Sequence, residues 1–138
     1  MKVKGITIHN TGNDLSAQDQ YKILVQNKKT NLCHYLIDEN EIINTLSEDM
    51  EASHTGAGYD YGNRFTIAIE ICRSRSDEET YLKAQKKAID FIKKLLKKYK
   101  LTNEDIYFHK DFSYTTYCPH RILDIYKTKE VFINGSFI

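Results

Sequence analysis

The chain has 138 residues, 41% of them hydrophobic, which suits one compact domain and leaves no room for a second independent core. Its 20 lysines and arginines are matched by 19 aspartates and glutamates, so the formal net charge is only +1. This balance excludes the basic excess of nucleic-acid-binding domains and also an acidic tail, so we expect one domain over residues 1–138 with no nucleic-acid partner.

A strand and a helix are predicted at the start of the chain. Residues 3–9 are β-prone and stop at a turn-forming stretch, residues 10–13. Ser16 then begins a helix-capping signature with Asp19 at its fourth position, and apolar residues recur after it at helical spacing. We therefore predict a first helix over residues 16–28.

The middle of the chain is predicted to contain three strands and a long loop. Residues 33–38 and 41–46 are β-prone runs separated by two polar residues, which indicates a hairpin or a close pair of strands. Residues 47–64 hold three of the six glycines and little apolar periodicity, which predicts a long surface loop of the kind that carries function. Residues 65–72 are apolar on both faces except for Glu70, so this strand should lie at the centre of a sheet.

A second helix and a last strand are predicted in the remaining part. Residues 76–79 form a capping signature, and apolar residues then recur at core-facing positions as far as Tyr99. Residues 106–109 are predicted to form a short strand, followed by a loop over residues 110–119 and an apolar C-terminal segment. The order β-α-β-β-β-α-β predicts an α/β fold with a central mixed β-sheet flanked by helices.

The second predicted helix is rich in lysine. Eight lysines lie between Lys83 and Lys100. They could face an anionic polymer, but ordinary surface statistics favour a solvated helix face, and we prefer that interpretation.

The sequence shows no export signal or membrane segment. Its first residues lack a basic stretch followed by an apolar one, and no stretch approaches membrane-spanning length. The three cysteines, Cys33, Cys72 and Cys118, are odd in number and irregular in spacing, which argues against a disulfide framework. We expect synthesis in the cytoplasm without a signal peptide, and no membrane insertion.

Two histidines and a cysteine stand where a sheet can bring them together. His9 and His109 each end a predicted strand, and Cys118 follows in the loop after the second. If the strands are neighbours, the three side chains converge at the edge where open α/β sheets place their ligands. Two imidazoles and a thiolate suit zinc and leave a fourth tetrahedral position open, as in catalytic sites. Spacing alone is a weak signal, and packed or surface histidines or a Cys118–His109 nucleophilic pair remain alternatives.

Glu70 is the only charged residue within the predicted central strand. A strand buried on both faces tolerates a carboxylate if it opens onto a polar site, where it can transfer protons. The alternative is a structural ion pair with Arg64, Arg73 or a lysine. The residues alone leave the two interpretations equally open.

Three strings of the sequence, ITIHNT, NRFTIAIEIC and HKDFSYTTYCPHRIL, resemble the signature segments of the zinc-dependent N-acetylmuramoyl-L-alanine amidases, a family that includes phage endolysins, phage amidase lysozymes and peptidoglycan recognition proteins. They occur in the family's order, and the resemblance covers residues 3–123. It implies an amidase/peptidoglycan recognition protein-like fold. It also implies a zinc hydrolase that cleaves the amide bond between N-acetylmuramic acid and L-alanine of the stem peptide, as a phage endolysin or autolysin.

The resemblance also implies roles for individual residues. It implies that His9, His109 and Cys118 are the zinc ligands. Glu70 matches the catalytic glutamate of many members, which transfers protons while zinc polarises the scissile carbonyl. His54 lies in a segment similar to the family's loop ending in His-Ala-Gly, which implies contact with the substrate.

Two positions depart from the family's pattern. Cys33 stands where some members carry a catalytic tyrosine, and Thr116 stands where others carry a lysine. Threonine at this position resembles the recognition-protein branch, and we expect Thr116 to donate a hydrogen bond during catalysis. Tyr59, in the predicted loop, is expected to line the substrate groove.

Bacterial peptidoglycan is the partner that the resemblance implies. The alternative is a non-catalytic module that binds muropeptides, but such a module has no need for a metal site with an open position, so the enzyme is favoured. Endolysins of this kind often carry a separate cell-wall-binding domain, and we expect none within residues 1–138. The protein is expected to act on the bacterial cell wall after release.

Overall fold

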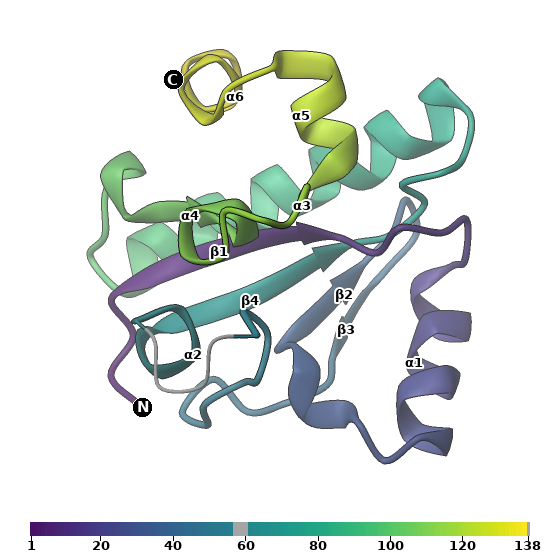
Figure 1. Cartoon of the computed structure of the whole chain (residues 1–138), viewed down its shortest axis with the longest axis horizontal. Helices are drawn as coiled ribbons and strands as arrows, with labels where there is room; N and C mark the ends of the chain where they lie inside the picture. Colours follow the sequence, from purple (N-terminus) through teal and green to yellow (C-terminus); the bar gives the residue numbers. More distant parts are fainter. Residues whose placement is uncertain (57–60, 138) are drawn as a thin grey trace.

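The computed structural model describes residues 1–56 and 61–137. Five strands form one sheet in the order β3-β2-β4-β1-β5, with helices packed against it (Figure 1). Only β3 is antiparallel to its neighbour, so the predicted mixed sheet with residues 65–72 at its centre is confirmed. The strands are β1 (Gly5–Asn10), β2 (Tyr35–Ile37), β3 (Ile42–Asn44), β4 (Thr66–Ile71) and β5 (Ile106–Phe108).

The main core joins the sheet to α3 (Glu78–Lys98), α5 (His120–Tyr126) and α6 (Lys129–Ser136). Alternate residues of the two central strands point into it, namely Ile6, Ile8, Ile67, Ile69 and Ile71. The sequence did not predict α6, because the helix is short and contains β-branched residues and a glycine, which favour helix formation weakly. The buried side chain of Phe132 packs this helix against the core. Even α3, the longest helix in the described part of the chain, is too polar to cross a membrane, and no other helix there qualifies.

A smaller apolar cluster lies under α1 (Ala17–Gln26), which contacts β2 and β3. The Ser16 hydroxyl accepts a hydrogen bond from the Asp19 backbone N–H at 3.1 Å, so the predicted helix cap is confirmed. A short 3-10 turn, Thr30–Leu32, leads from this helix to β2. Another, Asn103–Asp105, precedes β5.

Strand alternation and register place His9 and Glu70 side by side. Side chains along a strand alternate between faces, so both point away from the isoleucine core. His9 of β1 is also the direct register partner of Glu70 in the parallel strand β4. Two residues far apart in the sequence therefore meet near the carboxyl ends of neighbouring central strands.

The segment predicted as a surface loop, residues 47–64, contains buried residues in its described parts, 47–56 and 61–64. Its end forms α2 (Tyr61–Phe65), and His54 and Thr55 are buried, so the prediction was wrong for this part. The Asn63 side-chain oxygen accepts hydrogen bonds from the backbone N–H groups of His54 (2.9 Å) and Thr55 (3.0 Å). Hydrogen bonds from a side chain to the backbone produce no apolar periodicity in the sequence, so the pattern of apolar residues could not predict this burial.

The predicted last strand is one residue shorter than expected. β5 ends at Phe108, and His109 begins α4 (His109–Phe112), so residues 110–119 are not wholly a loop. Asp111 accepts a hydrogen bond from the Phe108 backbone N–H at 2.8 Å, which stabilises the start of α4. This contact fixes the backbone beside His109.

Candidate metal centre

The side chains of His9, His109 and Cys118 meet at the carboxyl edge of the sheet. β1 pairs directly with β5, so His9 near the end of β1 lies close to His109, which follows β5. One nitrogen or sulfur atom from each of the three residues lies within 4.8 Å of the others. The two imidazole ring centres are 4.7 Å apart. The sequence-based expectation that these side chains converge therefore agrees with the geometry, and the group could hold a metal ion.

The chemistry and spacing of this donor set suit zinc. The distance between His9 Nδ1 and Cys118 Sγ is 3.8 Å. In a tetrahedral zinc site the metal–nitrogen and metal–sulfur distances place these two atoms roughly 3.6 Å apart. Three donors leave one coordination position open, which distinguishes a catalytic from a structural zinc site.

Burial controls the protonation of the three donors. Burial, followed by the neighbouring rings of His54 and His109, holds the pKa of His9 well below its usual range, so His9 is neutral and has a free lone pair. Burial, followed by the charge of Glu70, raises the pKa of the Cys118 thiol to about 12. Metal binding must therefore displace the thiol proton of Cys118.

Glu70 lies directly beside the donor set. Its Oε1 atom is 3.8 Å from His9 Nδ1, and 23% of its side chain is exposed. Burial raises the pKa of Glu70 to about 8. Arg73, one of the ion-pair partners considered above, bonds instead to Glu39 at 3.1 Å. Among the described residues no lysine or arginine pairs with Glu70, and its neighbour is the neutral ring of His9, which favours the polar site over a structural ion pair.

The donors open into a cavity of about 350 Å³. Thr116 lines it, and the hydrogen bond expected of its hydroxyl during the reaction stays a prediction. Tyr59 lies outside the described residues. The lining residues are His9, Asn10, Leu32, Ser53, His54, Glu70, His109, Thr116 and Cys118.

His54 lies against His9, and both of its ring nitrogens have partners within the protein. Its Nδ1 atom is 2.9 Å from His9 Nε2, and its Nε2 atom is 2.9 Å from the Gly62 carbonyl oxygen. Only 9% of the residue is exposed. Contact between His54 and substrate stays a prediction, but the structure gives this residue a contact that the sequence did not suggest.

Asn10 is a site residue that the sequence analysis treated only as part of a turn. Its side-chain oxygen accepts hydrogen bonds from the backbone N–H groups of Arg121 (2.9 Å) and Ile122 (3.3 Å). Its side-chain nitrogen donates to the Tyr81 hydroxyl at 3.1 Å. These bonds tie the end of β1 to the start of α5 and so hold Cys118 near His9. Its position immediately after His9 was the one signal available in the sequence.

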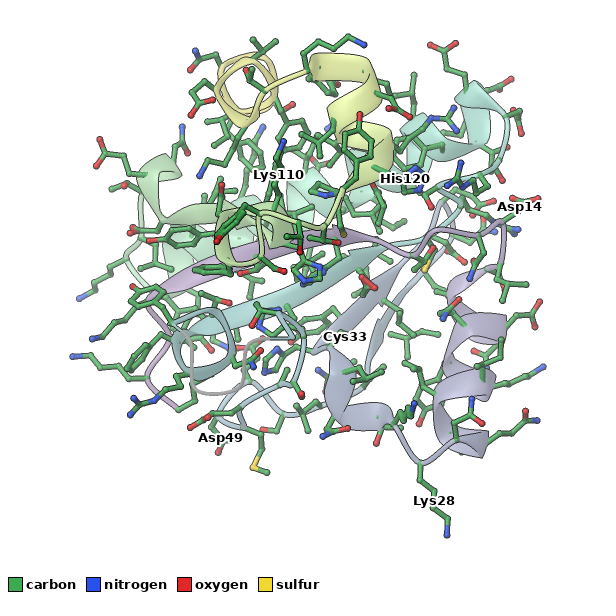
Figure 2. All side chains as sticks on the ribbon, in the orientation of Figure 1. Asp14, Lys28, Cys33, Asp49, Lys110 and His120 are labelled. Atoms are coloured by element: carbon green, nitrogen blue, oxygen red, sulfur yellow. The ribbon has the colours of Figure 1, made fainter. Side chains whose placement is uncertain are left out.

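A backbone hydrogen bond also joins the segments that carry His109 and Cys118. The Lys110 N–H donates to the Cys118 carbonyl oxygen at 3.0 Å. Figure 2 labels Lys110, which lies within α4, and His120, which begins α5. The His120 Nε2 atom lies 2.9 Å from the Ser74 hydroxyl, so this histidine belongs to a separate contact.

Cys33 does not line the cavity. It is buried in the cluster under α1, and its sulfur lies 3.5 Å from the Thr45 hydroxyl (Figure 2). Burial, and secondly the charge of Glu70, raise the pKa of its thiol to about 12. Cys33 is thus a small packed residue and offers no replacement for a catalytic tyrosine.

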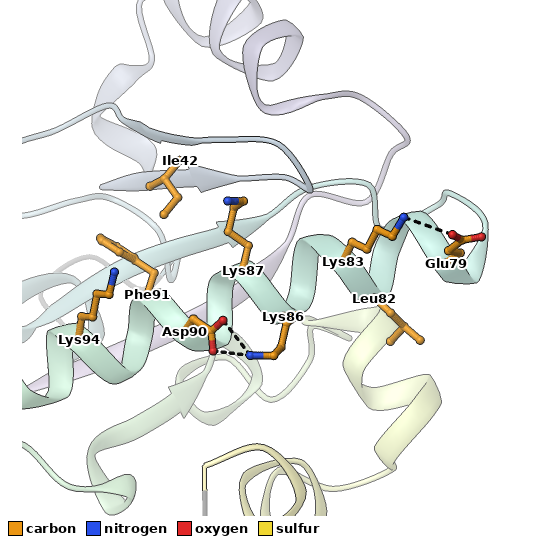
Figure 3. Close-up of a pocket in the computed structure, with 9 residues that line it drawn as sticks. All are labelled: Ile42, Glu79, Leu82, Lys83, Lys86, Lys87, Asp90, Phe91 and Lys94. Carbon is orange, nitrogen blue, oxygen red and sulfur yellow. Dashed lines mark hydrogen bonds and ion pairs between the residues drawn. The ribbon is translucent and has the colours of Figure 1, made fainter.

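A larger cavity, of about 690 Å³, lies between α3 and the edge strand β3 (Figure 3). Figure 3 shows Lys83 paired with Glu79 (3.2 Å) and Lys86 paired with Asp90 (2.7 Å) on its rim. Its lining contains no histidine or cysteine: Ile42, Glu79, Leu82, Lys83, Lys86, Lys87, Asp90, Phe91 and Lys94. The metal-binding side chains are therefore in the smaller cavity, and the paired, exposed lysines agree with a solvated helix face.

Comparison with known proteins identifies the family of the chain. A family model described as N-acetylmuramoyl-L-alanine amidase matches residues 1–121. The N-acetylmuramoyl-L-alanine amidase CwlA of Bacillus subtilis (strain 168) is 39% identical over 124 residues, which is 89% of this chain and 45% of that protein. XlyB of the same organism, also named an N-acetylmuramoyl-L-alanine amidase, is 40% identical over 124 residues, which is 89% of this chain and 39% of that protein. The chain therefore spans less than half the length of these curated relatives.

Solved structures show the same fold. The structure of PlyL superposes with a TM-score of 0.87 at 33% identity, over 95% of this chain and 82% of that one. The solution structure of the PlyG catalytic domain gives a TM-score of 0.87 at 31% identity, over 100% of this chain and 84% of that one. The fold, the converging donors and the family match agree, and the chain belongs to the N-acetylmuramoyl-L-alanine amidase family.

Proposed function

We propose that this domain uses a zinc ion to hydrolyse the amide bond between N-acetylmuramic acid and L-alanine of the peptidoglycan stem peptide. The observation that carries the proposal is the convergence of His9, His109 and Cys118 beside Glu70 in one cavity. The activity named for CwlA and XlyB supports the choice of bond. In this proposal residues 1–138 form the catalytic domain of an endolysin or autolysin, which acts on the bacterial cell wall, where this bond occurs.

The three converging residues would hold the zinc. His9 is neutral and Cys118 gives up its proton on binding, so the set supplies two imidazole nitrogens and one thiolate. When bound, zinc supplies Lewis acidity toward the scissile carbonyl and the attacking water. Asn10 keeps Cys118 in place by bonding the start of α5 to the end of β1.

Glu70 is assigned the proton transfer. Its carboxylate takes a proton from the attacking water and delivers it to the L-alanine nitrogen as the C–N bond breaks. The products are the carboxylic acid of the muramic lactyl group and the free amine of the peptide. Burial brings the pKa of Glu70 to about 8, close to neutrality, which suits a group that must take and return a proton. Its place on the central strand β4 gives it a rigid support.

Thr116 and His54 of the cavity, together with Tyr59, complete the proposed substrate site. The Thr116 hydroxyl is assigned to a hydrogen bond with the oxygen that gains negative charge in the transition state. Tyr59 is retained as a substrate contact because of its place in the predicted loop. His54 lines the cavity beside His9, and its place there is compatible with contact to the substrate.

The test is cleavage of a defined muropeptide by the purified protein. Mass spectrometry should detect free stem peptide and intact N-acetylmuramic acid in a ratio of one to one. Treatment with a chelator should abolish release, and zinc should restore it. A protein that binds the muropeptide but releases no peptide with zinc present would be a recognition module, and the proposed hydrolysis would be wrong.

A further inference from the structure

A chain of hydrogen bonds runs from a backbone carbonyl to His9. A carbonyl oxygen only accepts hydrogen bonds, so the contact of 2.9 Å between the Gly62 oxygen and His54 Nε2 places the proton of neutral His54 on Nε2. His54 Nδ1 then has no proton and must accept. The contact of 2.9 Å between this atom and His9 Nε2 therefore places the proton of His9 on Nε2.

The consequence is that the lone pair of His9 lies on Nδ1. This nitrogen is 3.8 Å from Cys118 Sγ and 3.8 Å from Glu70 Oε1, so it is the one that faces both a proposed metal ligand and the proposed proton-transfer residue. We infer that His54 is a positioning residue, which accepts the Nε2 proton of His9 and thereby fixes both the tautomer and the ring orientation in which His9 Nδ1 binds the metal. This inference rests on the proposed function, since it takes His9 as a metal ligand.

The surroundings of His54 support a positioning role. Its backbone N–H and that of Thr55 both donate to the Asn63 side chain, which holds the segment against α2. Gly62 allows this close packing, because a Cβ atom there would lie 2.5 Å from Thr55 Cγ2 and 2.8 Å from Phe112 Cδ2. The planes of the two imidazole rings are inclined at 74° with their centres 5.1 Å apart, and the ring atoms His9 Nε2 and His54 Nδ1 are 2.9 Å apart.

The first measurement needs no metal. Carbon and nitrogen chemical shifts of the His9 ring, recorded by NMR on the metal-free protein, report which nitrogen carries the proton. We expect the Nε2–H tautomer in the wild-type protein and a mixture of tautomers in His54→Ala. A wild-type His9 protonated on Nδ1 would overturn the inference, and this result does not depend on whether any variant folds.

The second measurement is zinc affinity by competition with a chromophoric chelator. His54→Ala should weaken zinc binding by roughly 10- to 100-fold, the usual effect of removing a partner that orients a metal-ligating histidine. His54→Asn keeps an acceptor oxygen near the position of Nδ1 and should recover most of the affinity. His34→Ala, the same substitution at a buried histidine that does not line this cavity, is the matched control and should bind zinc as the wild type does.

The outcomes separate this inference from the proposed function. A wild-type protein that binds no zinc, or binds zinc and cleaves no muropeptide, contradicts the proposed function, whereas the His9 tautomer still tests the hydrogen-bond chain. An unchanged zinc affinity in a folded His54→Ala protein would overturn the positioning role. If that variant also showed a higher KM, His54 would instead be a substrate contact.

Discussion

Two buried histidines, His9 and His34, use their ring nitrogens in different ways. His34, which precedes β2, accepts a hydrogen bond from the Ala68 backbone N–H at 2.9 Å and contacts the Met50 carbonyl oxygen at 2.7 Å through its other nitrogen. Both nitrogens thus serve the backbone and tie β4 to the segment that contains Met50. His9 bonds to His54 through one nitrogen and directs the other toward Cys118.

The pKa of the two histidines does not separate these roles. Burial is the largest cause that lowers the pKa of His9, and burial is also the largest cause that lowers the pKa of His34. The difference lies in the partners of the ring nitrogens. Those of His34 contact backbone groups, whereas those of His9 contact other titratable side chains. A histidine with a ring nitrogen surrounded by other titratable groups is a candidate for metal binding or catalysis. A histidine with backbone partners on both ring nitrogens has a structural role.

The largest effect is expected from removal of a proposed metal ligand. Cys118→Ala should lose stoichiometric zinc and all detectable muropeptide cleavage, because two imidazoles remain where three donors are needed. The free energy of unfolding of the metal-free protein should change by only about 1 kcal/mol or less, because Cys118 is only partly buried and belongs to neither apolar cluster. Elemental analysis, cleavage and urea unfolding on one preparation check this. A fully active variant would exclude Cys118 as a ligand.

The next effect concerns Glu70, which shares the face of the sheet with His9. Glu70→Gln keeps the size of the side chain but removes the base, so turnover should fall by roughly 10²-fold while zinc remains bound. If Glu70 were instead half of a structural ion pair, the substitution would cost about 3–5 kcal/mol of stability. A variant with a lower melting temperature and normal turnover in the cold would remove Glu70 from the mechanism.

His34 should show the opposite pattern. In His34→Gln the amide reaches toward the Met50 carbonyl but leaves the Ala68 N–H without its acceptor, which should cost about 1–3 kcal/mol of unfolding free energy. Zinc affinity and turnover of the folded protein should be unchanged. The same substitution at the other histidine, His9→Gln, is the matched control and should lose zinc. Equal zinc loss in both variants would contradict the distinction.

Much of the fold could be predicted because it depends on local patterns. The apolar run of 65–72 marked the central strand, and the Ser16 capping signature marked α1. The convergence of His9 and His109 required only that their strands be neighbours, which the β1–β5 pair satisfies. The family resemblance then supplied the expected roles.

The hydrogen bonds that orient the site residues could not be predicted, because they join polar atoms of residues that are far apart in the sequence. His9 and His54 are 45 positions apart, and their contact depends on how the segment that contains His54 folds back onto β1. That fold is fixed by the hydrogen bonds of Asn63, which produce no periodic signal. The role of Asn10 as a tie to α5 likewise follows from tertiary structure alone.

Acid should weaken the fold through His34. Burial lowers the pKa of this histidine in the folded protein, although the contact with Met50 and the charge of Glu48 oppose the shift. An unfolded histidine titrates near pH ~6.5. Below that value the unfolded chain binds a proton that the folded chain does not, so the stability from neutral His34 is complete above pH ~6.5 and is lost as pH falls below it. The effect is about 1.4 kcal/mol for each unit by which the pKa differs.

Urea unfolding of metal-free wild type and His34→Gln across pH ~5 to ~8 measures this effect. Metal-free protein is used because protons also compete with zinc for the histidine and cysteine ligands. The difference in stability between the two proteins should shrink as pH falls, since glutamine does not titrate. A constant difference would show that His34 keeps its ordinary pKa in the folded state.

The smallest effect is expected in the larger cavity beside α3, which has volume and lysines but no metal-binding side chains. Replacing both Lys87 and Lys94 with glutamine should change the unfolding free energy by no more than about 0.5 kcal/mol, as for most surface substitutions. Zinc content and cleavage of a soluble muropeptide should also be unchanged, because these lysines are not among the residues that line the zinc-site cavity. Cleavage of intact cell walls is the sharper measurement. If it fell while cleavage of the soluble muropeptide did not, the lysines would face an anionic polymer of the wall, and the solvated helix face would be the wrong interpretation.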